Sequence, residues 1–176
     1  METIVALGVF TLLLWSITAV FLMASQAQRR VAVTQRLLND ARYIIESIAS
    51  DMRIGIPDYD KNISSRFTDT LWLRDEDNNS IVYQRFTSSC AQDTPSCIKK
   101  SQDGGVTFSP LTSQGVIVPE DGLRFYISPR PSFWPGGTSQ TQPRVTILLT
   151  LQPAELLPYQ ISVSLQTSAS SRFYGQ

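Results

Sequence analysis

The side chains capable of chemistry are few, and the most reactive of them are two cysteines. Cys90 and Cys97 flank a polar segment that contains Pro95, so this segment is expected to form a tight turn. A disulfide across such a turn is geometrically plausible and requires an oxidising compartment. Two unpaired thiols in a cytosolic loop are the alternative. Because the chain has no histidine, the two cysteines cannot complete a zinc site without carboxylate ligands, and we expect no metal and no cofactor.

The composition argues against the usual catalytic arrangements. Histidine does not occur in the 176 residues, which removes the commonest general base and the Ser-His and Cys-His nucleophile pairs. The 15 basic and 15 acidic residues balance, so the chain lacks the positive charge that binds nucleic acid. We therefore expect neither an enzyme nor a nucleic-acid-binding protein.

Two further groups of residues are candidates for binding. Asp58, Asp60 and Asn62 have the spacing of the first ligands of a calcium loop, but the next position is Ile63 where Gly is required. We therefore interpret this segment as a solvated turn. Phe133 and Trp134 lie in a long loop, residues 129–143, rich in turn-forming residues. These two aromatic side chains either form an exposed interaction patch or fold back onto the rest of the domain, and the sequence leaves both possibilities open.

An apolar segment at the N-terminus must position Glu2. The run from Ile4 to Ala24 is long enough, at about 1.5 Å per residue, to cross a hydrocarbon layer of roughly 30 Å. We expect residues 1–28 to be a transmembrane segment and residues 29–176 to be an extracytoplasmic domain. A cleaved secretory signal is the rival interpretation, because residues 25–27 resemble a cleavage site. Against it, the first residues carry Glu2 and no basic residue, and the apolar run is longer than usual.

The charges around this segment conflict with the cysteines. The positive-inside rule would place Arg29 and Arg30 in the cytoplasm, whereas a disulfide between Cys90 and Cys97 requires the opposite orientation. A short basic leader upstream of Met1 would remove the conflict, because it would restore a positive cytoplasmic end.

The helical pattern continues beyond the apolar run. Apolar residues recur at helical spacing on one face, and charged or polar residues, Asp51 among them, occupy the other faces. Proline and glycine are absent from Val9 to Ile54; Gly55 then suits the position after a helix, and Pro57 blocks continuation. We expect one continuous helix of about fifty residues, with residues 29–54 amphipathic; a span, a hinge and a separate helix are the alternative. The apolar positions of the second half are Val31, Leu37, Leu38, Ala41, Ile44, Ile45, Ile48 and Met52.

The rest of the chain, residues 58–176, has the pattern of a sheet. Short β-branched or aromatic segments alternate with turn signals, which predicts successive hairpins and a mainly antiparallel sheet. The fold class is therefore α+β, with a long N-terminal helix, half transmembrane and half amphipathic, packed on that sheet. The expected strands are Phe67–Leu73, Ser80–Phe86, Cys97–Lys100, Leu123–Ser128, Val145–Gln152 and Tyr159–Thr167.

The first residues, Glu2-Thr-Ile-Val-Ala-Leu-Gly-Val-Phe10, resemble the start of type IV pilin-like proteins. In that family a characteristic glutamate, a few residues after the mature N-terminus, opens an apolar helix. The resemblance implies that Glu2 is an assembly residue that pairs with the N-terminal ammonium of a neighbouring subunit. It also implies a basic leader ending in Gly, removed by prepilin peptidase three residues upstream of Met1, and N-methylation. The alternative role for Glu2 is that of a carboxylate at the N-terminus of a helix, where the helix dipole stabilises it, typically by about 0.3–1 kcal/mol.

The similarity extends along nearly the whole chain. The segment Ala41–Arg53 looks like the end of the helix in J-type pseudopilins and related minor pilins, which often carry an Asp-x-Arg element, here Asp51-Met-Arg53. The expected strands follow the order found in these proteins, so the expected fold is pilin-like. The resemblance implies a structural minor subunit of a type IV pilus or of a type II secretion pseudopilus, in the tip or initiation complex. Such a subunit supports secretion, adhesion, motility or DNA uptake.

The resemblance also implies partners and a location. The partners are other pilin or pseudopilin subunits, the inner membrane, prepilin peptidase and the assembly platform. The protein would be a single-pass protein of the inner, cytoplasmic membrane with an extracytoplasmic C-terminal domain, and would join a cell-surface filament after assembly. A stand-alone, signal-anchored extracytoplasmic binding protein is the alternative. The gene sequence just upstream of the Met1 codon would separate the two.

Overall fold

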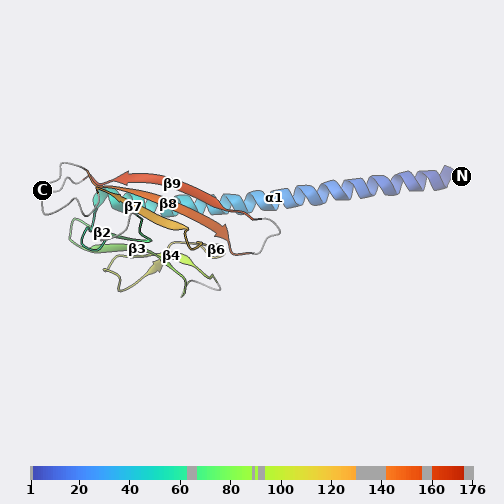
Figure 1. Ribbon diagram of the computed structural model, residues 1–176. Helices are drawn as coiled ribbons and strands as arrows, with labels where there is room; N and C mark the ends of the chain where they lie inside the picture. The colour runs from blue at the N-terminus through green and yellow to red at the C-terminus, as the bar shows by residue number, and fades with distance from the viewer. Residues whose placement is uncertain are drawn as a thin grey trace. The chain divides into compact units, whose positions relative to one another are not determined.

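The structure is a computed structural model, and the part of the chain that it describes has one long helix followed by nine strands; Figure 1 shows their arrangement. It describes residues 2–62, 67–88, 90, 94–129, 142–155 and 160–172. These residues form two compact units, Met1–Arg36 and Leu37–Gln176. The first unit consists of the N-terminal part of the helix, and the second contains the remainder of the helix and the strands.

The helix, α1, runs from Glu2 to Ile54 without a break, as the absence of proline and glycine from Val9 onward predicted. It ends where Gly55 donates a backbone hydrogen bond of 2.8 Å to the Asp51 carbonyl. Glycine fits there better than a larger residue because a Cβ atom would lie only 3.0 Å from the carbonyl oxygens of both Asp51 and Arg74. The reason is therefore the close approach of a strand to the helix end, because Gly55 is not among the residues with a positive φ.

One face of the C-terminal part of α1 is buried. The buried side chains lie three or four residues apart, so they form a single stripe. Val31 of the predicted stripe is exposed, and Leu38 and Ile45 are half-buried at its margin. The buried members are Leu37, Ala41, Ile44, Ile48 and Met52.

The first sheet contains five antiparallel strands in sequence order, β1 to β5. Five residues, 75–79, join β2 to β3. Asn78, at φ 64°, closes the turn between β2 and β3 with a hydrogen bond of 2.9 Å from its N–H to the Asp75 carbonyl. The strands are β1 (Ile56–Pro57), β2 (Thr70–Arg74), β3 (Ser80–Phe86), β4 (Cys97–Ser101) and β5 (Ser109–Pro110).

The second sheet is built around its longest strand, β8 (Arg144–Pro153). β7 (Leu123–Ser128) and β9 (Val163–Ser170) pair with the same stretch of β8 and therefore lie on opposite sides of it, while β6 (Val116–Ile117) pairs with its end. All these pairings are antiparallel, so the predicted α+β fold, a long helix packed on antiparallel sheet, is confirmed. No strand among the described residues pairs with the other side of β9, which is an edge of the sheet (Figure 1).

Most predicted strands coincide with observed ones, with two shifts. The strand expected from Phe67 begins only at Thr70, because Thr68 forms a bridge with Phe125 of the second sheet through hydrogen bonds of 2.7 and 3.0 Å. The last strand begins later than expected and continues to Ser170. Burial alternates along β7 and β8, where every second residue is buried.

Candidate functional site

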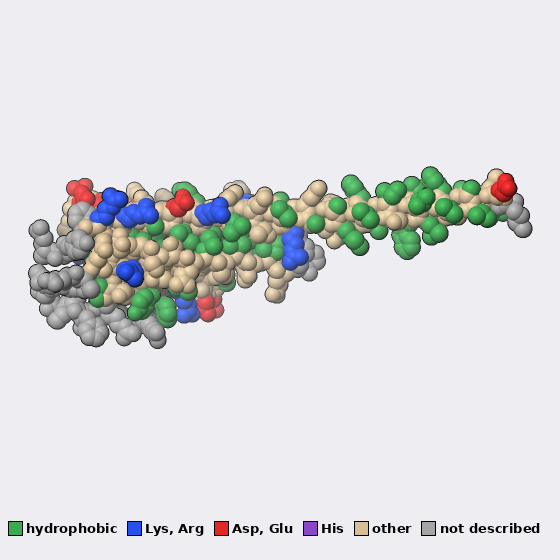
Figure 2. Space-filling model, turned by 90° about the horizontal axis from the view of Figure 1, so that it is seen from above, with side chains coloured by type: hydrophobic (Ala, Val, Ile, Leu, Met, Phe, Trp, Pro, Cys, Tyr) green, Lys and Arg blue, Asp and Glu red, His purple; other side chains and the backbone are tan. Residues whose placement is uncertain are grey.

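The N-terminal part of α1 is apolar on all sides and exposed. Its most apolar 18-residue window has a mean hydropathy of 2.4, and none of that window is buried in the structure. Trp15 is 76% exposed, and hydrophobic side chains gather along this part of the helix in Figure 2. By length and composition this helix could cross a membrane; a signal sequence has the same properties.

Glu2 is the acidic residue of the first turn of α1. Among the described residues, its carboxylate has neither a hydrogen-bond nor an ion-pair partner. The partner expected for Glu2 is the N-terminal ammonium of a neighbouring subunit, which a single chain does not contain.

Four polar side chains meet where the C-terminal part of α1 contacts the first sheet. The Asp51 carboxylate accepts a hydrogen bond of 2.5 Å from the Tyr83 hydroxyl, and its Oδ2 lies 2.6 Å from the Lys100 ammonium. Ser47, one turn earlier on α1, has its hydroxyl 3.3 Å from that of Tyr83. The Asp51 and Lys100 side chains are only 14% and 16% exposed. We call Ser47, Asp51, Tyr83 and Lys100 the helix–sheet cluster.

Asp51, expected on a face of the helix other than the apolar stripe, is largely buried against the first sheet. The carboxylate tolerates burial because Lys100 neutralises it and Tyr83 donates to it. Burial, followed by the hydrogen bond to Asp51, raises the pKa of Tyr83 well above its ordinary value, so the phenol stays protonated as a donor. The sequence carried no sign of this cluster, since its members come from α1, β3 and β4.

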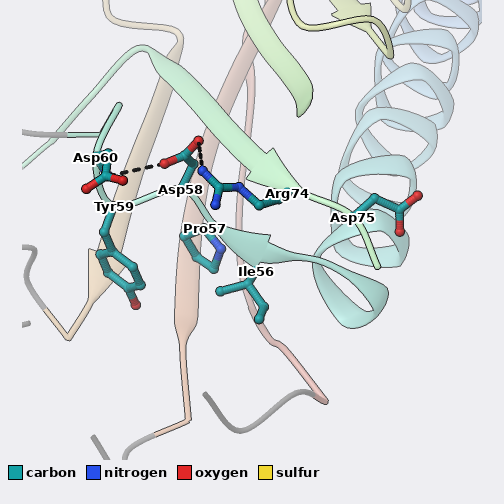
Figure 3. A pocket seen from close by; sticks show the side chains of 7 residues that line it. All are labelled: Ile56, Pro57, Asp58, Tyr59, Asp60, Arg74 and Asp75. Carbon is teal, nitrogen blue, oxygen red and sulfur yellow. Dashed lines mark hydrogen bonds and ion pairs between the residues drawn. The ribbon is translucent and has the colours of Figure 1, made fainter. Parts of the chain in front are cut away.

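A second polar arrangement lies beside β1 and β2, at a cavity of about 280 Å³ (Figure 3). Asp58 is buried, and its Oδ2 lies 3.0 Å from Nη2 of Arg74. Its Oδ1 accepts a hydrogen bond of 3.2 Å from the Asp60 amide, whereas the Asp75 side chain points away from this pair in Figure 3. The cavity is lined by Ile56, Pro57, Asp58, Tyr59, Asp60, Arg74 and Asp75.

The interpretation of residues 58–62 as a solvated turn is wrong at its two ends. Asp58 and Asn62 are both buried, and the Asn62 amide donates to the carbonyls of Asp58 and Trp72 at 2.7 and 2.8 Å. The Asn62 side-chain oxygen accepts from the Trp72 amide at 3.1 Å. These bonds fasten the segment to β2, so the spacing of the acidic and amide residues reflects a folded turn. Burial raises the pKa of Tyr59 in the same segment to about 12, so its phenol is neutral at physiological pH.

Cys90 and Cys97 are joined by a disulfide in the structure. Cys97 begins β4, where it pairs with Phe86 at the end of β3, so the bond lies at the turn between these two strands. Phe133 and Trp134 lie in residues 130–141, outside the residues that the structure describes.

The loop between β4 and β5 is held by one carboxylate. Asp103 accepts hydrogen bonds from the Ser101 hydroxyl at 2.6 Å, from the Thr107 amide at 2.9 Å and from the Val106 amide at 3.0 Å. The hydrogen bonds from Ser101 and then Thr107 lower the pKa of Asp103 below its ordinary value. Val106, at 80% exposure, is the most exposed large hydrophobic residue of the described part of the chain.

The carboxylates of Asp51 and Asp58 already have partners. Asp51 is paired with the Lys100 ammonium and the Tyr83 hydroxyl, and Asp58 is paired with Arg74 and the Asp60 amide. Across the described ranges, no three His, Cys, Asp or Glu side chains come together in a way that could hold a metal ion. Comparisons with known proteins found no matching family model, no matching curated protein and no matching solved structure.

Proposed function

We propose that this chain is a minor pilin or pseudopilin, a structural subunit of a type IV pilus or type II secretion filament. The observation that carries the proposal is the helix from Glu2 to Ile54, apolar and exposed in its first part and packed on an antiparallel sheet in its second. In this proposal the first part anchors the subunit in the inner membrane and later packs against neighbouring subunits. The domain after residue 28 lies outside the cytoplasm.

The position of Glu2 supports an assembly role. A carboxylate at the edge of a membrane-embedded helix costs free energy, roughly 3 kcal/mol at the centre of a bilayer and less toward the surface. A neighbouring subunit's N-terminal ammonium would offset that cost and would fix the axial register of the two helices. Prepilin peptidase and the assembly platform are the further partners that this role requires.

The disulfide supports an extracytoplasmic domain. Cys90 and Cys97 are bonded, and such bonds persist in oxidising compartments. An orientation with the domain outside the cytoplasm therefore agrees with the cysteines, whereas the charges of Arg29 and Arg30 alone would favour the reverse.

The test is replacement of Glu2 in the full chain expressed in its native host. Glu2→Ala should leave membrane insertion and the folded domain intact, because Glu2 has no partner in the described residues, while lowering the amount of the subunit in sheared filaments about tenfold or more. Glu2→Gln should behave in the same way, because it also removes the charge.

Glu46→Ala is the matched control, since Glu46 is an exposed glutamate on the same helix within the domain. Normal incorporation of the Glu2 variants into filaments would refute the assembly role and favour a stand-alone anchored binding protein. N-terminal sequencing of membrane material separately tests the processing: cleavage after Ala27 would show that the apolar segment is a secretory signal.

A further inference from the structure

The segment that follows the apolar run is purely cationic. From Thr3 to Asn39 the only ionisable side chains are those of three arginines, and the next carboxylate is that of Asp40. All three arginines are exposed on α1. The Asp40 carboxylate accepts a hydrogen bond from the Ser113 hydroxyl and so belongs to the folded domain. The three residues are Arg29, Arg30 and Arg36.

The helical rise places two of these arginines at the depth of lipid headgroups. The apolar stretch from Ile4 to Ala24 is about 31 Å long at 1.5 Å per residue, which matches the hydrocarbon thickness of a bilayer. Arg29 and Arg30 lie about 7–9 Å further along the axis. The polar layer on each side of the hydrocarbon is about 5–8 Å thick. Side chains on a helix lean toward its N-terminus, so these guanidinium groups reach back toward that layer.

The chemistry of the side chain favours phosphate. A guanidinium group binds two phosphate oxygens at once through parallel N–H donors, and its charge persists at any physiological pH. We propose that Arg29 and Arg30 bind the phosphate groups of anionic phospholipids at the membrane surface next to α1. The proposal rests on the proposed membrane anchor, and it holds for either orientation of the chain.

Lipid is the occupant because the apolar run holds the arginines at the bilayer surface, where anionic headgroups are concentrated. Each arginine near an anionic surface should favour the anionic lipid about fivefold, so the pair should enrich it up to about twenty-fivefold beside the helix. Arg36 lies about 18 Å beyond Ala24 along the axis and should contribute less.

Trp15 allows this enrichment to be measured, because it lies in the apolar run and is exposed to the surroundings of the helix. The full chain is reconstituted in phosphatidylcholine vesicles in which either the phosphatidylcholine or added phosphatidylglycerol carries brominated acyl chains, which quench tryptophan on contact. A Trp15→Phe variant supplies the signal of Trp72 and Trp134 for subtraction. Brominated phosphatidylglycerol should quench Trp15 several-fold more efficiently than brominated phosphatidylcholine at equal mole fraction.

In the double variant Arg29→Ala and Arg30→Ala, both brominated lipids should quench Trp15 equally. Raised salt should reduce the preference of the native chain for phosphatidylglycerol. Arg42→Ala, an exposed arginine further along the same helix, should retain the preference. Equal quenching of the native chain by the two lipids, or an unchanged preference in the double variant, would overturn the inference. Absence of quenching by either lipid would instead overturn the membrane anchor itself.

Discussion

Single side chains hold two parts of the domain that the backbone alone would leave loose. Asp103 gathers donors from Ser101, Val106 and Thr107, and so fixes the loop between β4 and β5. Asp51 gathers Tyr83 and Lys100, and so fastens α1 to the first sheet. In each case one carboxylate accepts hydrogen bonds from several donors, so its removal should lower the stability of the fold more than removal of any one donor.

The loop at Asp103 should make stability depend on pH. Its pKa is lowered in the folded chain from the ordinary value of 3.8, so the stabilisation is complete above that value and is lost as the pH falls below it. Asp103→Asn should therefore lower the urea midpoint at pH 7, and the difference from the native chain should shrink as the pH falls from about 5 toward 2. A difference that does not change with pH would show that the charge is irrelevant.

Removal of Asp51 should be far more costly. Asp51→Ala leaves the Lys100 ammonium and the Tyr83 hydroxyl without their partner in a largely buried site. The expected loss is roughly 3–5 kcal/mol of the free energy of unfolding. The measurement is urea unfolding of the full chain in detergent, with Asp60→Ala as the exposed control, expected to change stability by less than about 0.5 kcal/mol. A small loss in the Asp51 variant would mean that water replaces the carboxylate.

At the scale of elements, the C-terminal part of α1 contributes one narrow stripe of side chains to the core. Ile48 is fully buried in that stripe, whereas Tyr43 on the same part of the helix is 60% exposed. Ile48→Ala should cost roughly 2–5 kcal/mol, because it removes buried methyl groups and leaves a cavity. Tyr43→Ala should cost little. Equal effects of the two substitutions on thermal unfolding would contradict the packing face assigned to the helix.

The disulfide stabilises the hairpin of β3 and β4 chiefly by lowering the conformational entropy of the unfolded chain. Cys90 and Cys97 are separated by 7 positions, and closing so short a loop is worth roughly 2.5 kcal/mol in the chain-entropy model. Cys90→Ser with Cys97→Ser should therefore lower the free energy of unfolding by about that amount. Reduction of the native chain should give the same loss, whereas the double variant should not respond to a reductant.

The elements were predictable where periodicity is strong and long. The amphipathic part of the helix, up to Ile54, follows from apolar residues that recur every 3.6 residues on average. Strands such as β8 follow from apolar residues at every second position. The two-residue strands β1, β5 and β6 carry no such pattern, because they exist only through pairing with longer strands. The helix–sheet cluster could not be predicted from the sequence either. Its members are distant in sequence, and a single Asp on an amphipathic helix gives no indication that a Lys and a Tyr approach it.

On the scale of the whole molecule, the chain divides into two compact units at Arg36 and Leu37. Removal of residues 1–28 should therefore leave the domain folded, with an unfolding midpoint close to that of the full chain. The shortened chain should remain in the aqueous phase of a Triton X-114 separation, whereas the full chain should enter the detergent phase. A full chain that stays in the aqueous phase would contradict the proposed anchor.

The position of β9 at the edge of its sheet has a practical consequence for solubility. Val163–Ser170 contains no charged residue and no proline, the residues that usually prevent an edge from pairing with another chain. Because the Ser171 amide donates to the Pro143 carbonyl, the alternation along the strand points the backbone groups of Gln166 and Ser168 away from β8. The purified domain should therefore associate at high concentration, and Gln166→Lys should raise the concentration at which light scattering first increases. A single charge on this strand sets how concentrated a sample of the domain can be made.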